Sequence, residues 1–205
     1  MKTTVPPFLG KLGWCLALVA AALPLAPETA RSQELLKNPD FESPFPVSDP
    51  TAGWALVYAD GGPSDFAIAG QSTEASRCCG GRGAHLRPNN WNFAHAYFRQ
   101  VVTNLVPGAR YTLTIQKMRA GFQNYVDNDS LRVYMAALSG SSSNVVAGNA
   151  TNNGPYSLTI TCAPSGQIEV RLHMWKRSMT NESSEDMKHA KCSAWFDDIS
   201  LTQTP

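Results

Sequence analysis

The sequence predicts an all-β protein, a β-sandwich of the jelly-roll type. No long stretch carries apolar residues at the spacing of three and four that an amphipathic helix requires. Short runs rich in Val, Ile, Thr and Tyr recur instead between clusters of Gly, Pro, Asn and Ser. Pro107-Gly108 suits a type II turn, and Pro164-Ser165-Gly166 can close a hairpin. Short strands joined by such turns are typical of sandwiches and jelly rolls.

The predicted strands follow from alternation of side chains along short runs. In order, the runs cover 54–58, 84–87, 97–102, 110–118, 131–135, 156–162, 167–176 and 193–201. The clearest is 167–176, in which every second residue is apolar and one face therefore belongs to the core. The apolar set is Ile168, Val170, Leu172 and Met174. The opposite face is available for another role and carries Glu169, Arg171, His173 and Trp175.

The last predicted strand, SAWFDDISL, contains a break in its alternation. Phe196 has even parity, whereas Ile199 and Leu201 have odd parity. The slip falls at Asp197-Asp198. A β-bulge at this point would add one residue and turn the carboxylates away from the core.

The chain begins with the layout of a secretory signal peptide. Lys2 and Lys11 lead into an apolar run over 14–23, and small residues at Ala30 and Ser32 suit a signal peptidase. We therefore expect residues 1–32 to be removed and residues 33–205 to form a single secreted domain, extracellular, periplasmic or on the cell surface. The run is too short to span a bilayer, so no membrane insertion is expected.

Charge argues against nucleic acid or an anionic membrane as partner. The full chain has a formal charge of +1, and removal of residues 1–32 changes it to −1. We expect a monomer.

Four cysteines remain after the expected cleavage: Cys78, Cys79, Cys162 and Cys192. An even number in an exported chain favours disulfides, and three pairings are possible. We expect at least one long-range bridge from Cys162 or Cys192. A metal site is the less favoured alternative because the sequence has no Cys-x-x-Cys pair.

Three fragments, taken in order, resemble one family. They are LKNPDFE at 36–42 followed by Gly53-Trp54, FRQVVTNLVPGARYTLT at 98–114, and WFDDISL at 195–201. Together they are similar to carbohydrate-binding modules with the galactose-binding-domain-like jelly roll, of the cellulose- and xylan-binding type. The resemblance spans almost the whole expected mature chain. It implies a non-catalytic module that binds a polysaccharide or glycan.

The resemblance also implies a structural calcium ion where the first and last strands meet. Glu42 and Asp197 match the carboxylate positions, and Asp198 could assist. Calcium takes six to eight oxygen ligands, and clustered carboxylates repel one another unless a cation joins them. The alternative is that the two aspartates only accept hydrogen bonds in a turn.

Candidate sugar-binding residues are aromatic side chains accompanied by polar ones, because rings stack on sugar C–H faces and polar groups fix the hydroxyls. Trp91 and Asn92 lie in a segment too polar for a core strand, although Trp91 could also anchor the core. Trp175 could bind sugar or pack beneath the polar segment 177–191. The family binds either along a sheet face or at loop tips, so both regions stay open. The candidate set is Trp91, Asn92, Tyr125, Tyr134, Arg171 and Trp175.

No catalytic motif is apparent in the sequence. It has no nucleophile elbow, no His-Glu-x-x-His and no phosphate-binding Gly-rich loop. Arg171, His173 and Tyr134 are the constellation that a polysaccharide lyase could use, with a base, a proton donor and a cation for a uronate. We predict a non-enzymatic glycan-binding protein. The alternatives are an extracellular structural or adhesion sandwich without a sugar site and, third, a polysaccharide lyase.

Overall fold

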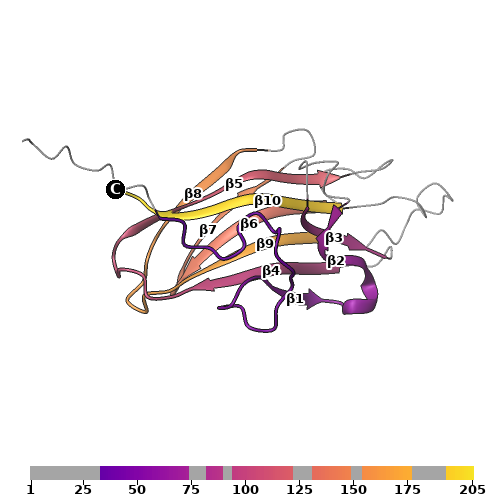
Figure 1. Ribbon diagram of the computed structural model, residues 1–205, viewed down its shortest axis with the longest axis horizontal. Coiled ribbons are helices and arrows are strands. Elements are labelled where there is room, and N and C mark those ends of the chain that lie inside the picture. The colour runs from indigo at the N-terminus through magenta and orange to yellow at the C-terminus, as the bar shows by residue number, and fades with distance from the viewer. Residues whose placement is uncertain (1–32, 74–81, 90–93, 122–130, 149–153, 177–192) are drawn as a thin grey trace, which may run out of the picture. The chain divides into compact units, whose positions relative to one another are not determined.

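The computed structural model describes residues 33–73, 82–89, 94–121, 131–148, 154–176 and 193–205 (Figure 1). The chain divides into Met1–Arg31 and Ser32–Pro205, and every described element belongs to the second unit. Trp91, Asn92 and Tyr125 lie outside the described residues, as do Cys78, Cys79 and Cys192. None of the described helical segments is long and apolar enough to cross a membrane.

The described elements are strands and one short 3₁₀ turn, η1 (Pro63–Asp65). The predicted all-β class is therefore confirmed. The strands are β1 (Ala55–Asp60), β2 (Phe66–Ser72), β3 (Gly83–Pro88), β4 (Ala94–Val102), β5 (Arg110–Gly121), β6 (Leu131–Ser139), β7 (Ser142–Ala147), β8 (Tyr156–Thr161), β9 (Ile168–Lys176) and β10 (Ser193–Gln203).

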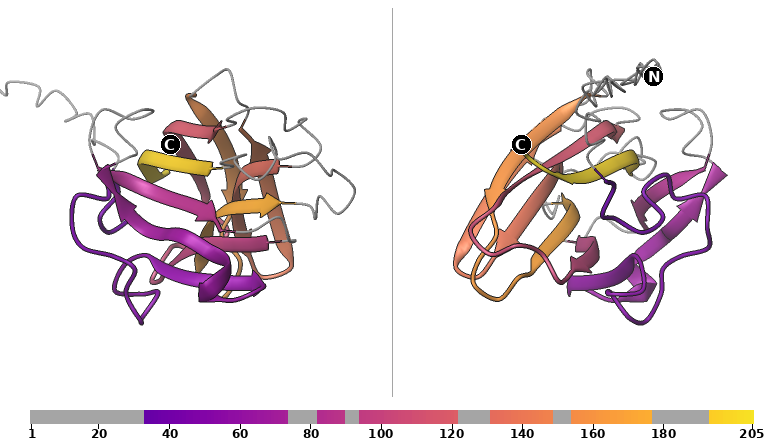
Figure 2. Two further views of the ribbon diagram at one scale, coloured as in Figure 1. Left: turned by 90° about the vertical axis from the view of Figure 1, so that its right-hand side faces the viewer. Right: turned by 60° about the vertical axis from the view of Figure 1, so that its left-hand side comes forward.

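These strands form two antiparallel sheets that face each other (Figure 2). Sheet 1 has the order β1-β4-β9-β6-β7, and sheet 2 has the order β2-β3-β10-β5-β8. Most neighbours within a sheet are distant in the chain, as in the jelly roll that the sequence predicts. β9 lies at the centre of sheet 1 and β10 at the centre of sheet 2, so both late strands are paired on two sides.

The core fills the space between the inner faces of the sheets. On β9 it receives the predicted apolar set, since Ile168, Val170, Leu172 and Met174 are buried while Trp175 and its alternating partners face outward. Trp54, which we assigned to structure, is fully buried, and its Nε1 donates to the carbonyl of Asn38 at 3.0 Å.

The alternation of inward and outward side chains in β10 changes at Asp198, as the sequence indicated. The expected β-bulge is wrong, because no extra residue interrupts the pairing of β10 with β5. Phe196 pairs with Met118 and Ile199 pairs with Ile115, so the register with β5 is the same on both sides of the break. The buried residues of β5 also change parity here, from Met118 to Ile115. In both strands the core-facing residues therefore change from one parity to the other at the same level of the sheet. Asp198 adopts a φ of 51°, which permits this change in β10.

The N-terminal segment replaces β3 beside β10 at the same level. β3 pairs with β10 only from Ala194 to Phe196. Beyond the break, the amide of Ile199 donates to the carbonyl of Pro39 at 3.0 Å, and Leu35 donates to the carbonyl of Leu201 at 3.1 Å. The opening and closing motifs of the family resemblance thus lie side by side.

Gly154 lies close to the part of β5 in which the buried residues change parity. It has a φ of 129°, and a Cβ there would collide with the backbone oxygen of Gln116. We expect Gly154→Ala to lower the unfolding free energy by about 2 kcal/mol or more, because the collision is with backbone and the dihedral is unfavourable for Ala. Gly62→Ala is the control, since its φ is −145° and no atom lies within 4 Å of its Cβ position. Urea denaturation measures both changes, and an equal effect of the two variants would contradict the expectation.

Candidate functional site

The outer face of sheet 1 gathers aromatic and charged side chains from several strands. Tyr97 of β4, His173 of β9 and Tyr134 of β6 are directly opposite one another across three adjacent strands, and we call them the aromatic row. Residues paired in this way share one face of a sheet. The complete set, called the polar face below, is Asp60, His95, Tyr97, Arg99, Arg132, Tyr134, Glu169, Arg171, His173 and Trp175.

The rings of the aromatic row stack on one another. The centroids of Tyr134 and His173 are 4.3 Å apart with the planes at 11°, and those of Tyr97 and His173 are 4.6 Å apart at 32°. His173 is covered on both ring faces and is only 5% exposed. Side chains stand roughly upright on a sheet, so the hydroxyl ends of the two tyrosines point away from the strands.

His173 is a neutral imidazole held by a second histidine. His95 Nε2 lies 3.0 Å from His173 Nδ1. Burial, assisted by His95 and Arg171, lowers the pKa of His173 to about 3. Burial also lowers the pKa of His95, against the opposing effect of Asp60, whose Oδ2 lies 3.9 Å from His95 Nδ1. The pair therefore adds no positive charge at neutral pH.

Trp175 occupies the next level of the polar face, between His95 and Arg132. The guanidinium carbon of Arg132 lies 5.3 Å from the centroid of the Trp175 ring. Trp175 is half-buried, which is usual for an aromatic ring with one polar companion.

Arg99 and Arg171 occupy the level on the other side of the aromatic row, directly opposite each other. Glu169 Oε1 lies 2.5 Å from the Nε of Arg171 and 3.6 Å from the Nε of Arg99. The guanidinium carbon of Arg171 also lies 4.9 Å from the centroid of the Tyr97 ring.

The structure brings three predicted residues, Tyr134, Arg171 and Trp175, onto this one face. The other three candidates, Trp91, Asn92 and Tyr125, lie on the segments outside the described residues. Sequence reasoning did not single out Tyr97, His95, Arg99 or Asp60. The alternation within 95–101 could have shown which of these face outward, but only strand pairing shows that they adjoin β9.

The geometry does not favour the lyase constellation of Arg171, His173 and Tyr134. The three residues do adjoin, but His173 has both ring faces covered and little exposed surface. A base must reach the proton that it removes. Burial raises the pKa of Tyr134, against the effect of Arg171 and Arg132, so its phenol stays protonated at neutral pH.

A cavity of about 420 Å³ lies elsewhere, at the end of β2, and is lined by Gln71, Ser72, Thr73 and Arg82. Among the described residues, its lining has no aromatic ring. The polar face is therefore the stronger candidate for carbohydrate chemistry.

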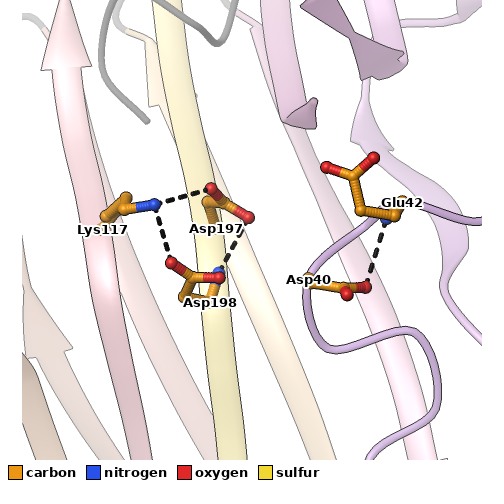
Figure 3. A network of polar contacts seen from close by, with 5 residues as sticks. All are labelled: Asp40, Glu42, Lys117, Asp197 and Asp198. Atoms are coloured by element: carbon orange, nitrogen blue, oxygen red, sulfur yellow. Dashed lines mark hydrogen bonds and ion pairs between the residues drawn. The ribbon is translucent and has the colours of Figure 1, made fainter. Parts of the chain in front are cut away.

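The expected calcium ligands meet a lysine instead. Lys117 Nζ of β5 lies 2.7 Å from Asp198 Oδ2 and 3.2 Å from Asp197 Oδ2 (Figure 3). Asp197 Oδ1 accepts from the amide of Asp198 at 2.9 Å. Glu42 lies apart from this pair on the N-terminal segment, where its amide donates to Asp40 Oδ1 at 3.3 Å (Figure 3).

The carboxylates as arranged do not fit a calcium ion. The ammonium group of Lys117 already lies between the two aspartates, and Glu42 does not join them. Among the residues that the structure describes, no group of three His, Cys, Asp or Glu side chains could hold a metal. The Lys117 ammonium supplies the positive charge that clustered carboxylates need.

Cys162 is a free thiol and is buried at 2% exposure. The expected bridge from Cys162 is therefore wrong, and this cysteine acts as a small apolar residue of the core beneath β8. The remaining cysteines lie outside the described part of the chain.

No family model matches the chain, and no curated protein matches it. Solved structures do. TmCBM61 in complex with β-1,4-galactotriose aligns with a TM-score of 0.55 and 13% identity over 84% of this chain and 100% of that one. A family 16 carbohydrate-binding module aligns at 0.46, with 17% identity over 82% and 99% of the two chains. The likeness to TmCBM61 confirms the predicted β-sandwich jelly-roll fold.

A third similar structure is a xylanase 10B fragment from Clostridium thermocellum, with CBM22-1 and GH10 modules, complexed with xylohexaose. It aligns at a TM-score of 0.45 with 13% identity, over 85% of this chain and 29% of that one.

If Lys117 replaces the cation, Lys117→Met should lower the unfolding free energy by about 1–3 kcal/mol, because the Asp197 carboxylate, only 6% exposed, loses its ionic partner. A chelator should leave the melting temperature of the native protein unchanged. Lys37→Met is the control, since its Nζ donates to the exposed carbonyl of Thr51 rather than to a buried carboxylate. A melting temperature that falls with chelator and recovers with calcium would restore the calcium prediction.

The pH dependence of stability tests the same carboxylate. Burial raises the pKa of Asp197 from 3.8 to about 6. The folded state then holds this proton when the unfolded state has lost it, so the unfolding free energy falls as pH rises from about 4 to about 6. In Asp197→Asn that fall, up to about 3 kcal/mol, should be absent. Urea denaturation across this pH range measures it, and parallel profiles for the two proteins would contradict it.

Proposed function

We propose that this protein is a secreted, non-catalytic glycan-binding module and that the polar face of sheet 1 is its binding surface. The observation that carries the proposal is the gathering of Tyr97, Tyr134 and Trp175 with arginine and carboxylate side chains on one exposed sheet face. Sugar recognition needs both elements, since rings contact C–H faces and charged or amide groups bind the hydroxyls.

The rings of the polar face differ in which contact their geometry favours, stacking on a sugar or hydrogen bonding to its hydroxyls. Tyr97 and Tyr134 share ring faces with His173, so their hydroxyl ends are the parts best placed for hydrogen bonds with a sugar. Trp175, half-buried beside Arg132, is the ring best placed to stack on a pyranose. A face that crosses several strands suits a chain of sugars better than a single one.

The similar structures support the ligand class. TmCBM61 is described with a galactotriose, and it shares the fold over the whole of its own length. The signal-peptide pattern of residues 1–32 supports export, where polysaccharides are met. The covered position of His173 supports a binding role over a lyase role.

Affinity electrophoresis on plant, algal and bacterial polysaccharides tests the proposal. The native protein should be retarded by at least one of them, and Trp175→Ala and Tyr97→Ala should each weaken binding about tenfold, because each removes a contact worth about 1.4 kcal/mol. Trp195→Ala is the matched control, since Trp195 belongs to sheet 2 and stacks on His85. The melting temperature of each variant checks its fold.

Three other results would replace the proposal or part of it. Absence of retardation would favour the structural or adhesion alternative, and retardation that neither Trp175→Ala nor Tyr97→Ala weakens would place the binding site away from the polar face. Release of an unsaturated, ultraviolet-absorbing product from alginate or pectate would make the protein a lyase.

A further inference from the structure

Arg99 and Arg171 form a like-charged pair in a position where sheets usually avoid one. They are directly opposite on β4 and β9, on the same face. Like charges at opposite positions destabilise a sheet unless a counter-charge lies between them. The flanking strands supply none at this level, because β1 places Ala55 opposite Arg99 and β6 places Ala136 opposite Arg171.

Glu169 compensates only part of this charge. One of its oxygens, Oε1, serves the Nε of both arginines, at 2.5 Å and 3.6 Å. A guanidinium has five N–H donors. Arg171 donates its Nε to Glu169, whereas the buried Nε of Arg99 lies in ion-pair range of Glu169 but has no hydrogen-bond partner among the described residues. The two side chains are 33% and 28% exposed, so a ligand can reach the terminal Nη groups.

The positive charge is local to the polar face. In the described part of the chain, this face holds three arginines, including Arg132, and two carboxylates, Asp60 and Glu169. The two histidines are neutral, as argued above. The expected mature chain as a whole is slightly acidic, so the excess of positive charge on this face is not the consequence of a basic protein.

The arginine pair is also shaped for a planar or tetrahedral anion. The Arg171 guanidinium is fixed over the Tyr97 ring at 4.9 Å and by Glu169 on its Nε side. A guanidinium held in this way can bind a carboxylate or sulfate with two parallel hydrogen bonds. The aromatic row begins one level further along both strands, where the same glycan chain would continue.

We propose that the glycan bound by the polar face is acidic and that its carboxylate or sulfate groups bind between Arg99 and Arg171. The inference rests on the proposed glycan-binding function and adds the charge class of the ligand. Among the described residues Glu169 offsets only one of the two positive charges, and the anion supplies the remaining counter-charge.

Titration calorimetry with the native protein tests the ligand class. The acidic probes are polygalacturonate for carboxylates and dextran sulfate for sulfates, and the neutral probes are β-1,4-galactan, xylan and carboxyl-reduced polygalacturonate. We expect at least one acidic probe to bind about tenfold more tightly than its neutral counterparts and to weaken with added salt. The acidic probe that binds identifies the anion as carboxylate or sulfate.

Substitution tests the residues. Arg171→Gln and Arg99→Gln should each weaken binding of the acidic probe about tenfold to a hundredfold, which is more than they weaken binding of any neutral probe. Neither should lower the melting temperature by much, because each relieves a like-charged pair. Arg110→Gln removes the same charge from an exposed position at the start of β5 in sheet 2, and it should leave the affinity unchanged.

Three outcomes would overturn the inference. Equal affinity for polygalacturonate and its carboxyl-reduced form, with no binding of dextran sulfate, would remove the acidic class while leaving the proposed glycan-binding function intact. An equal loss on Arg110→Gln and Arg171→Gln would reduce the effect to net charge. Absence of binding to every probe, acidic and neutral, would overturn the proposed function together with the inference.

Discussion

The register of β9 between β4 and β6 is the constraint on which both the core and the polar face depend. Leu172 lies opposite Phe98 and Met135 on the inner side, and His173 lies opposite Tyr97 and Tyr134 on the outer side. A slip of one residue would exchange these two sets, burying charged groups and exposing the core. The apolar face therefore fixes the register, and the register assembles the polar face.

A second constraint acts in the other sheet, where β5 and β10 change faces together. The change lies at Asp197 and Asp198, at the level where β3 ends and the N-terminal segment begins to pair. Lys117 joins the two carboxylates from the adjacent strand. The ion pair raises the pKa of Lys117, while burial dominates at Asp197 and raises its pKa in spite of the ion pair. The Lys117 ammonium thus offsets part of the charge of the two carboxylates.

Local alternation predicted much of this arrangement. It identified the outward set of β9, including Trp175 and Arg171, and the break at Asp197-Asp198. It could not show what lies across the strands, because pairing partners are far apart in the chain. Lys117 is 80 residues from Asp197, and His95 is 78 residues from His173. The Lys117 contact of the two aspartates and the free thiol of Cys162 could not be predicted for the same reason, since both depend on neighbours that only the fold supplies.

The stacking within the aromatic row has a consequence for binding energetics. Three rings from three strands already restrict one another, and Glu169 and Tyr97 restrict Arg171. Ordering a free side chain at an interface costs about 0.5–1.5 kcal/mol, and here folding meets that cost before a ligand arrives. The free protein therefore presents a preorganised surface, whose affinity should be limited by removing water from its polar groups rather than by loss of side-chain entropy.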